Sequence, residues 1–366
     1  MSSEYHLGFD PVDDALWDDS LQAFGDANIY QTREYGVARW GEASLWNFRF
    51  MRGRAVVAMG QAVARRLPLL GGGLAYMPWG PVWRGEGNDV ETFRAFISAL
   101  REEVSVRRGY LLRLAPAEWD TPGNPCADVL AAAGFERARD GYRTLVIDLT
   151  PGMDVIRSGL NRSWRRALKR ADQLGVAIEE GTGDYLYESF KHMYREMVVR
   201  KGFLPFIDID EFQHMQRRLP AHLKMHIMIA RLKDKPVAAL TASRMGEGGL
   251  GLLGATANDG LSSGAFHLVN LRMMAWLREQ GARYYDFGGY DPDGNRGTAG
   301  FKDGLPGHEV RHLGVYEASA HPARSWLIHR AEQGRQLARR ARVGAAVHHH
   351  QHAPSRIPYP LEKVPK

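Results

Sequence analysis

The sequence predicts an α/β protein built from two similar lobes, each with a mixed central sheet. The chain has 366 residues, which exceeds the usual size of one compact core. One order of elements also occurs twice along it, as a tandem duplication would produce. We expect an N-terminal lobe at 1–150, a C-terminal lobe at 151–344 and a mobile tail at 345–366, which has several prolines and no core-forming pattern.

The first copy of the repeated order lies between residues 45 and 114. Alternating apolar residues on both sides of the turn at Gly53 predict a hairpin, and a third strand follows a run of three glycines. Apolar residues at helical spacing then predict a helix, which Gly109 ends before a last strand. The predicted ranges are 45–50, 55–64, 74–78 and 110–114 for the strands and 90–107 for the helix.

The second copy lies between residues 225 and 287. Two strands around a short charged turn, a third strand, a helix ended by a glycine and a last strand repeat the order of the first copy. Between the copies we expect a basic helical stretch at 154–175 and helices at 185–202 and 208–218. The predicted ranges of the second copy are 225–232, 237–244, 249–255 and 283–287 for the strands and 265–280 for the helix.

This order of elements matches the central part of the acetyltransferase-like (GNAT) fold. In that fold two central strands splay apart and open a cleft for an acyl donor or acceptor. Other α/β units share pieces of the order, so its repetition along the chain adds weight to the match. The sequence thus predicts two tandem GNAT-like lobes with mixed central sheets.

The composition predicts a globular protein of the cytoplasm with a phosphate-bearing partner. Apolar residues make up 44% of the chain and charged residues 25%. The single cysteine, Cys126, excludes an internal disulfide framework and a cysteine-rich metal site. The acidic start has no signal-peptide pattern, and no apolar run reaches the length of a membrane span. The net charge of +6 favours nucleic acid or nucleotide-linked ligands, and basic residues concentrate at 157–170 and 330–342.

The loop before the second predicted helix differs from an acetyl-CoA site. Such a site places a basic residue or glutamine and several glycines ahead of the helix, whose N-terminus then binds the pyrophosphate. The stretch Leu261-Ser262-Ser263-Gly264-Ala265 has one glycine and no basic residue, so we interpret it as a helix-capping loop. The HHHQH run at 348–352 predicts incidental metal affinity, and we expect no catalytic metal and no bound cofactor.

Six motifs follow one another in the second half of the chain. They are LVIDL near 145–149, KRADQLGV, YREMVVRKGF, LLGATAND, YYDFGGYDP and, at 300–305, GFKDGL. In this order they resemble the Fem family of aminoacyltransferases that build peptidoglycan interpeptide bridges, and the resemblance covers roughly 140–317. It implies transfer of an amino acid from aminoacyl-tRNA to an amine on a peptidoglycan precursor, a peptide or a metabolite. The chain lacks the coiled-coil arm of some Fem proteins, and Gly254-Ala255-Thr256 replaces the tyrosine-serine character common near the fourth strand.

The basic helical stretch contains the first group of candidate residues. Trp164 stands among cations that include Arg162, Arg165 and Lys169, and an aromatic ring amid cations suits phosphate-bearing ligands. A solvated connector explains the same charges. The resemblance implies that an arginine of this segment binds the phosphates of a nucleotide-linked acceptor, with Arg165 and Lys169 as the nearest match.

Lys302 is the sharpest candidate, because it follows Phe301 between two glycine-bearing turns. A constrained loop at this place would present a fixed ammonium group, although most lysines are ordinary surface residues. The resemblance implies that Lys302, beside Phe301, meets the end of the tRNA and the developing oxyanion. A fixed cation there would stabilise the tetrahedral intermediate more than the neutral ester.

Two other segments contribute candidates. Asp286 and Tyr290 lie at the predicted end of a central strand, where Asp286 could orient an amine or carry its proton, or could cap the strand end. Tyr194 and Arg200 lie on successive turns of one helix and are candidates for an acceptor site. An ion pair between Glu196 and Arg200 would explain part of this pattern without a ligand.

Three functions therefore remain open from the sequence. The resemblance favours an aminoacyltransferase with aminoacyl-tRNA as co-substrate. An N-acyltransferase that uses acetyl-CoA or another acyl-CoA is the second hypothesis, and a non-catalytic tRNA- or nucleotide-binding module is the third. The sequence identifies neither the amino acid nor the amine.

Overall fold

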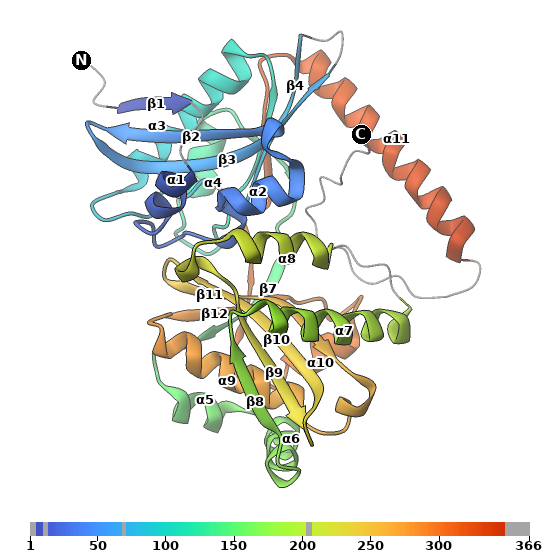
Figure 1. Ribbon diagram of the computed structural model, residues 1–366. Coiled ribbons are helices and arrows are strands. Elements are labelled where there is room, and N and C mark those ends of the chain that lie inside the picture. The colour runs from blue at the N-terminus through green and yellow to red at the C-terminus, as the bar shows by residue number, and fades with distance from the viewer. Residues whose placement is uncertain (1–4, 10–13, 68–70, 203–206, 348–366) are drawn as a thin grey trace. The chain divides into compact units, whose positions relative to one another are not determined.

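The computed structural model describes residues 5–9, 14–67, 71–202 and 207–347 (Figure 1). The chain divides into two compact units. Unit 1 combines the described residues up to Tyr142 with those from Arg311 onward, and unit 2 spans Arg143–Val310. Within the described ranges, no helix has both the length and the apolar run that a bilayer crossing requires.

Unit 1 is built on a seven-stranded mixed sheet in the order β1-β2-β3-β4-β5-β14-β6. Neighbouring strands are antiparallel except β4 and β5, which are parallel. The strands are β1 Tyr5–Phe9, β2 Leu45–Arg52, β3 Ala55–Leu67, β4 Gly72–Pro78, β5 Leu111–Ala115, β6 Glu136–Arg139 and β14 Val315–Ala318. The helices are α1 Asp14–Leu21, α2 Arg33–Trp40, α3 Val90–Leu100, α4 Cys126–Ala132 and α11 Pro322–Val347, and a π-helical segment, Arg101–Arg107, continues α3.

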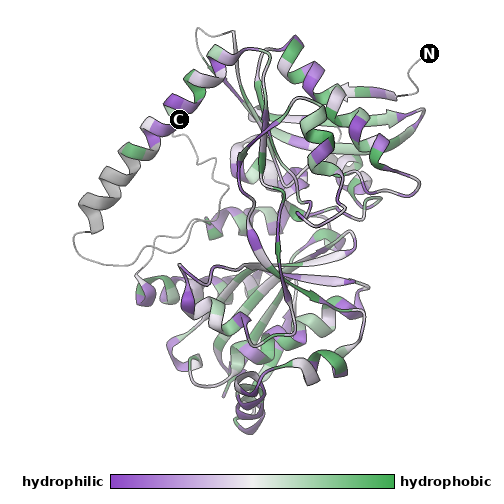
Figure 2. Ribbon diagram, turned by 180° about the vertical axis from the view of Figure 1, so that it is seen from behind, coloured by the Kyte–Doolittle hydropathy of each residue, from purple (hydrophilic) through white to green (hydrophobic). Residues whose placement is uncertain are grey.

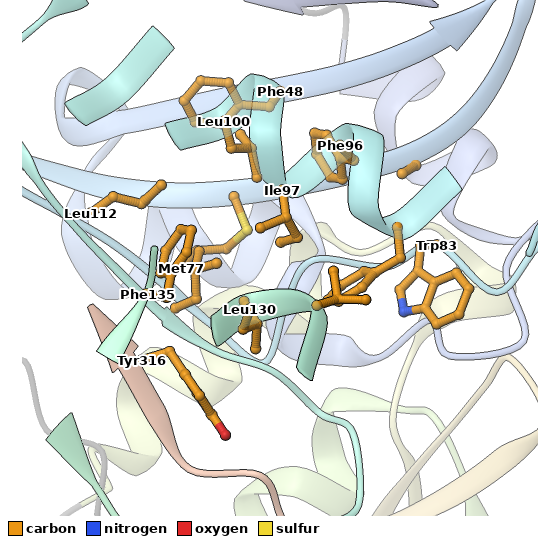
Figure 3. Packing of buried hydrophobic residues seen from close by; sticks show 14 of the residues in the cluster. Phe48, Met77, Trp83, Phe96, Ile97, Leu100, Leu112, Leu130, Phe135 and Tyr316 are labelled. Carbon is orange, nitrogen blue, oxygen red and sulfur yellow. The ribbon is translucent and has the colours of Figure 1, made fainter. Parts of the chain in front are cut away.

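Helix α3 supplies the centre of the unit 1 core (Figure 3). Phe96, Ile97 and Leu100 recur at helical spacing and are fully buried, so they form one apolar face. Figure 3 shows this face over the sheet residues Met77 and Leu112. The apolar spacing recognised in the sequence is therefore the packing face.

Unit 2 is built on a second seven-stranded mixed sheet in the order β13-β7-β12-β11-β10-β9-β8. Its central pair, β11 and β12, is parallel. The strands are β7 Arg143–Asp148, β8 Ala177–Gly181, β9 His226–Leu232, β10 Lys235–Met245, β11 Gly248–Thr256, β12 Tyr284–Gly289 and β13 His308–Arg311. The helices are α5 Met153–Gly159, α6 Arg162–Gln173, α7 Asp184–Lys201, α8 Ile209–Arg218, α9 Ala265–Glu279 and α10 Arg296–Lys302.

Helix α9 fills the unit 2 core in the way that α3 fills the unit 1 core. Val269, Met273 and Leu277 recur at intervals of four residues and are fully buried. They belong to one apolar cluster with the sheet residues Ala238 and Leu240. Every strand and helix of the two predicted copies is present, so the predicted tandem GNAT-like fold is confirmed.

The unit boundaries differ from the expected division into 1–150 and 151–344. Strand β7, expected in the first lobe, pairs with β12 in the unit 2 sheet. Near the other end of the chain, β14 inserts between β5 and β6 of the unit 1 sheet. Each sheet is thus completed by a strand from the other half of the sequence, a long-range pairing that local patterns do not reveal.

Two local predictions also need correction. The basic stretch 154–175 is two helices, α5 and α6, separated by an extended residue at Leu160. The segment 345–347, expected to begin a mobile tail, is the end of α11. The rest of that tail, with the HHHQH run, lies outside the described residues.

Candidate functional site

The parallel strands of unit 2 separate where those of unit 1 stay together. In unit 1 the register of β4 and β5 runs from Leu74↔Leu111 to Pro78↔Ala115, and Trp79 N–H donates to Ala115 O at 2.7 Å just beyond it. In unit 2, β11 and β12 share only three register pairs, the last of which joins Leu250 and Asp286. Both strands continue past that pair, to Thr256 and Gly289. The predicted splay of the central strands is therefore present in unit 2.

The end of β12 is irregular and is held by Asp286. The pairing of β12 with β7 shifts register between Asp286 and Gly289, and Gly288 has a positive φ of 75°, which a side chain would disfavour. The Asp286 carboxylate accepts hydrogen bonds from Gly288 N–H at 2.8 Å and from the Thr144 hydroxyl. Asp286 is buried, so the strand-capping interpretation of this residue accounts for its observed contacts.

Lys302 lies at the end of α10, so the expectation of a constrained loop that exposes it is wrong. Its side chain is only 5% exposed. The ammonium group donates to three successive carbonyl oxygens of β12, those of Phe287 at 2.8 Å, Gly288 at 2.6 Å and Gly289 at 2.8 Å. An ammonium group has three protons, and all three are engaged. Lys302 is thus fastened to the strand at the point where β12 leaves β11.

The environment of Lys302 changes its acidity. Burial disfavours the charged form and lowers the pKa of Lys302 from its usual 10.5 to about 8, while the negative charge of Asp286 acts in the opposite direction. The amine therefore titrates near physiological pH. A neutral amine has two protons to donate and loses its charge, so the hold on the three carbonyl groups weakens as the pH rises through this range.

Phe301 is the centre of an aromatic cluster next to this point. Its ring lies 4.8 Å from that of Trp164, 4.9 Å from His267, 5.3 Å from Phe266 and 6.1 Å from Phe287. The cluster joins residues of α6, α9, α10 and β12. Figure 1 shows α9 and α10 within unit 2, and α9 packs against β9 and β10.

Trp164 does not form the exposed stacking surface that its basic neighbours suggested. It is 1% exposed, and its indole Nε1 donates to the Phe301 carbonyl oxygen at 2.8 Å. The sequence interpretation also missed His267, whose pKa falls to about 4 because its ring is partly withdrawn from water. A histidine in the first turn of the helix after a capping loop was the available signal.

The start of α9 is occupied by the protein itself. Gly264 has a φ of 77°, and a Cβ atom there would lie 2.0 Å from the Ala167 carbonyl oxygen of α6. The first amide of α9, Ala265 N–H, donates to Ser263 Oγ at 3.1 Å, and Arg170 Nε donates to Ser262 O at 2.6 Å. The Ala265 amide, one of the groups that a pyrophosphate would use, is thus bound within the loop, and the helix-capping interpretation of this loop agrees with the geometry.

Helix α7 reaches the other side of the strand separation. Arg200 donates to Asn258 Oδ1 and to Thr256 O, both at 2.8 Å, and Glu196 accepts from Asn258 N–H at 2.9 Å. Both side chains therefore hold the end of β11. Tyr194 is buried against Phe190 in the packing of α7, at a ring distance of 5.6 Å.

The predicted residues other than Tyr194 thus fall into three places. Asp286, Phe301 and Lys302 lie together at the end of β12, and Tyr290 belongs with them because its hydroxyl donates to Asp303 Oδ1 at 2.6 Å, one residue beyond α10. Arg200 lies at the end of β11. The third place is the exposed side of α6, which carries Arg162, Arg165 and Lys169.

Comparisons with known proteins agree with this geometry. Residues 156–303 match the family described as an acetyltransferase (GNAT) domain. The crystal structure of FemX is similar with a TM-score of 0.74 and 16% identity, over 88% of this chain and 99% of that one. The C-terminal domain of a putative lysylphosphatidylglycerol synthetase from Agrobacterium fabrum is similar with a TM-score of 0.55 and 14% identity. The match covers 83% of this chain and 91% of that one. The structure of L-PGS from Bacillus licheniformis is similar with a TM-score of 0.51 and 14% identity, over 75% of this chain and 84% of that one.

A search of curated protein sequences gives no match. At the identities above, the structural likeness establishes the fold. The chain has a FemX-like fold, and its residues 156–303 match a GNAT domain, as the sequence motifs predicted.

Proposed function

We propose that the protein transfers an amino acid from aminoacyl-tRNA to an amine and thereby forms an amide bond. The GNAT domain match and the FemX-like fold support an acyltransferase. The proposal that aminoacyl-tRNA is the donor rests on a pair of features around β11 and β12. The strands separate beside a fixed lysine, while Gly264, just before the helix that would bind the pyrophosphate of CoA, lies close against Ala167 of α6.

The reaction needs alignment more than covalent catalysis. The acceptor nitrogen attacks the carbonyl carbon of the aminoacyl ester, a C–N bond forms, the ester C–O bond breaks, and the nitrogen proton is lost as the tRNA hydroxyl leaves. The ester is already activated, so correct positioning and stabilisation of the oxyanion lower the barrier. Because aminoacyl-tRNA is the donor, we place the reaction in the cytoplasm.

We assign roles to the residues that the structure gathers at the end of β12. Lys302 holds the strand and places a positive charge beside the separation, and Asp286 fixes the turn at Gly288. Phe301 is positioned to pack against the tRNA end or the amino-acid side chain, with Tyr290 beside the same strand. We propose that Arg200 supports the acceptor side, and that Arg162, Arg165 and Lys169 contact phosphates of the donor or acceptor.

The proposal is tested by following the fate of the ester bond. The protein is incubated with tRNA charged with labelled amino acids and with candidate amines, among them peptidoglycan precursors, peptides and small metabolites. Loss of ester that depends on the amine, with label recovered in an amide, supports the proposal. Release of CoA from acetyl-CoA with the same amines, without any tRNA-dependent product, would replace it with an acyl-CoA N-acyltransferase. Binding of tRNA without turnover would indicate a non-catalytic tRNA-binding module.

A further inference from the structure

The exposed side of α6 carries positive charge that the described protein does not neutralise. Arg162, Arg166 and Lys169 have the spacing i, i+4, i+7, which places them on one face of the helix. All three side chains are exposed. Within the ranges that the structure describes, none of the three forms an ion pair. We call these three residues the α6 basic face.

Several other cations of unit 2 are arranged differently. They lie beside a carboxylate, so their charge is balanced inside the protein. The pairs are Arg143–Glu309 at 2.7 Å, Arg217–Asp184 at 2.8 Å, Arg231–Glu179 at 2.7 Å and Arg272–Glu180 at 2.7 Å. A row of unbalanced cations on one helix raises the local positive potential and favours an anionic partner from outside the chain.

The opposite side of α6 fixes the position of this face. Trp164 and Ala171 are buried, and Trp164 Nε1 donates to Phe301 O at 2.8 Å. Asn161 N–H, at the start of the helix, donates to Gly304 O at 3.0 Å, just beyond α10. Figure 2 shows the helix at the lower end of unit 2, coloured mostly as hydrophilic. A ligand on the basic face is therefore held in a defined position relative to Phe301 and Lys302.

We propose that the α6 basic face binds successive phosphates of the double-helical acceptor stem of tRNA. From Arg162 to Lys169 the helix rises by about 10 Å. Cations spread over this length suit the repeated phosphates of a nucleic-acid backbone, whereas the diphosphate of a nucleotide-linked acceptor offers two adjacent groups. With Trp164 buried, the face has no ring for base stacking, so it recognises backbone charge rather than sequence. This inference rests on the proposed donor.

The test uses the full chain and deacylated, fluorescently labelled tRNA, with binding followed by anisotropy over a salt series. Arg162→Gln, Arg166→Gln and Lys169→Gln are combined in one variant. The matched control removes the same charge from exposed positions elsewhere in unit 2, as Lys233→Gln, Arg278→Gln and Arg283→Gln. We expect the Kd of the α6 variant to rise more than tenfold at about 100 mM salt and its salt slope to fall by about two to three, because each phosphate contact contributes about 0.9.

The outcomes separate this inference from the proposed function. If the α6 variant and the control variant are both folded by circular dichroism and bind tRNA equally well, the inference about the α6 basic face is wrong. The proposal that aminoacyl-tRNA is the donor would not be affected by that result. Loss of binding to phosphatidylglycerol vesicles in the α6 variant, with tRNA binding unchanged, assigns the face to a membrane and also overturns the inference. A wild-type protein that binds no tRNA contradicts both proposals.

Discussion

The two units have the same order of elements but treat their central parallel strands in opposite ways. In unit 1, β4 and β5 pair along the whole of β5 and up to the end of β4, and the Trp79 to Ala115 hydrogen bond extends the pairing beyond the strands. In unit 2, β11 and β12 pair over three residues and then separate, and Lys302 takes up carbonyl groups of the departing strand. A duplicated fold can therefore keep its architecture in both copies while only one keeps the open strand pair that acyl transfer uses.

The largest expected effect comes from removing the cation that holds β12. Lys302→Ala should lower the rate of single-turnover transfer from aminoacyl-tRNA by about a hundredfold or more, because the end of β12 loses the group that positions it and the positive charge beside the separated strands. It should also destabilise unit 2 by about 1–3 kcal/mol, because buried carbonyl oxygens lose their partner. Lys302→Arg keeps the charge with a different shape and should retain partial activity. Near wild-type transfer in a folded Lys302→Ala protein would show that the separated strands work without this lysine.

A substitution at the start of α9 tests whether that helix terminus is closed. Gly264→Ala would bring a Cβ atom against the Ala167 carbonyl oxygen and would force a side chain into a positive φ, so we expect a loss of about 1–3 kcal/mol. Gly334→Ala in α11 is the matched control, since a Cβ atom there meets nothing within 4 Å, and it should be neutral or slightly stabilising. Chemical denaturation measures both. Equal stabilities would mean that α6 does not cover the terminus.

The pH dependence follows from the lowered pKa of Lys302. Its charge is present below about pH 8 and is lost above it, so the wild-type rate relative to that of Lys302→Met should fall as the pH rises through 8. Taking the ratio removes the ionisation of the acceptor amine. The pH dependence of the free energy of unfolding has the opposite sign, so the stability rises where the rate ratio falls. The unfolded chain binds more protons between about pH 8 and 10.5, so the cost of burying the charge is relieved as the pH rises through that window. A ratio that stays constant up to pH 10 would contradict this assignment.

The smallest effect is expected at Arg165. Among the residues that the structure describes, its guanidinium group donates only to the Ser158 carbonyl oxygen, at 3.3 Å, and the side chain is exposed. Arg165→Ala should raise KM for the phosphate-bearing substrate about two- to threefold and leave kcat nearly unchanged, because the contact acts equally on the ground and transition states. Steady-state kinetics beside Arg278→Ala gives the comparison. A KM that matches this control would remove Arg165 from the binding surface.

Local periodicity predicted the elements well because each strand and helix buries its own apolar face. The same periodicity predicts that Trp164 is buried, since it shares a helix face with Leu168 and Ala171. The surrounding arginines favoured the interpretation of an exposed, charged site. Lys302 could not be placed in the same way. Its partners lie 13 to 15 residues earlier, on an irregular strand end whose shape depends on tertiary packing.

Local patterns could not predict the unit boundaries, because these also depend on contacts between distant parts of the sequence. Strand β14 pairs with β5 across roughly two hundred residues, as Tyr316 with Leu114. Nothing in the local sequence of either strand specifies that partner. Such pairing is decided by the whole sheet and not by a window of neighbouring residues.

The central claim is that the separated strands of unit 2, and not the closed pair of unit 1, receive the aminoacyl end of tRNA. Amide hydrogen exchange with and without a tRNA carrying a non-hydrolysable, amide-linked amino acid tests it directly. We expect slower exchange at 251–256 and 287–289 and unchanged exchange at 79–82 and 115–117. Protection of the unit 1 segments with none in unit 2 would contradict the account.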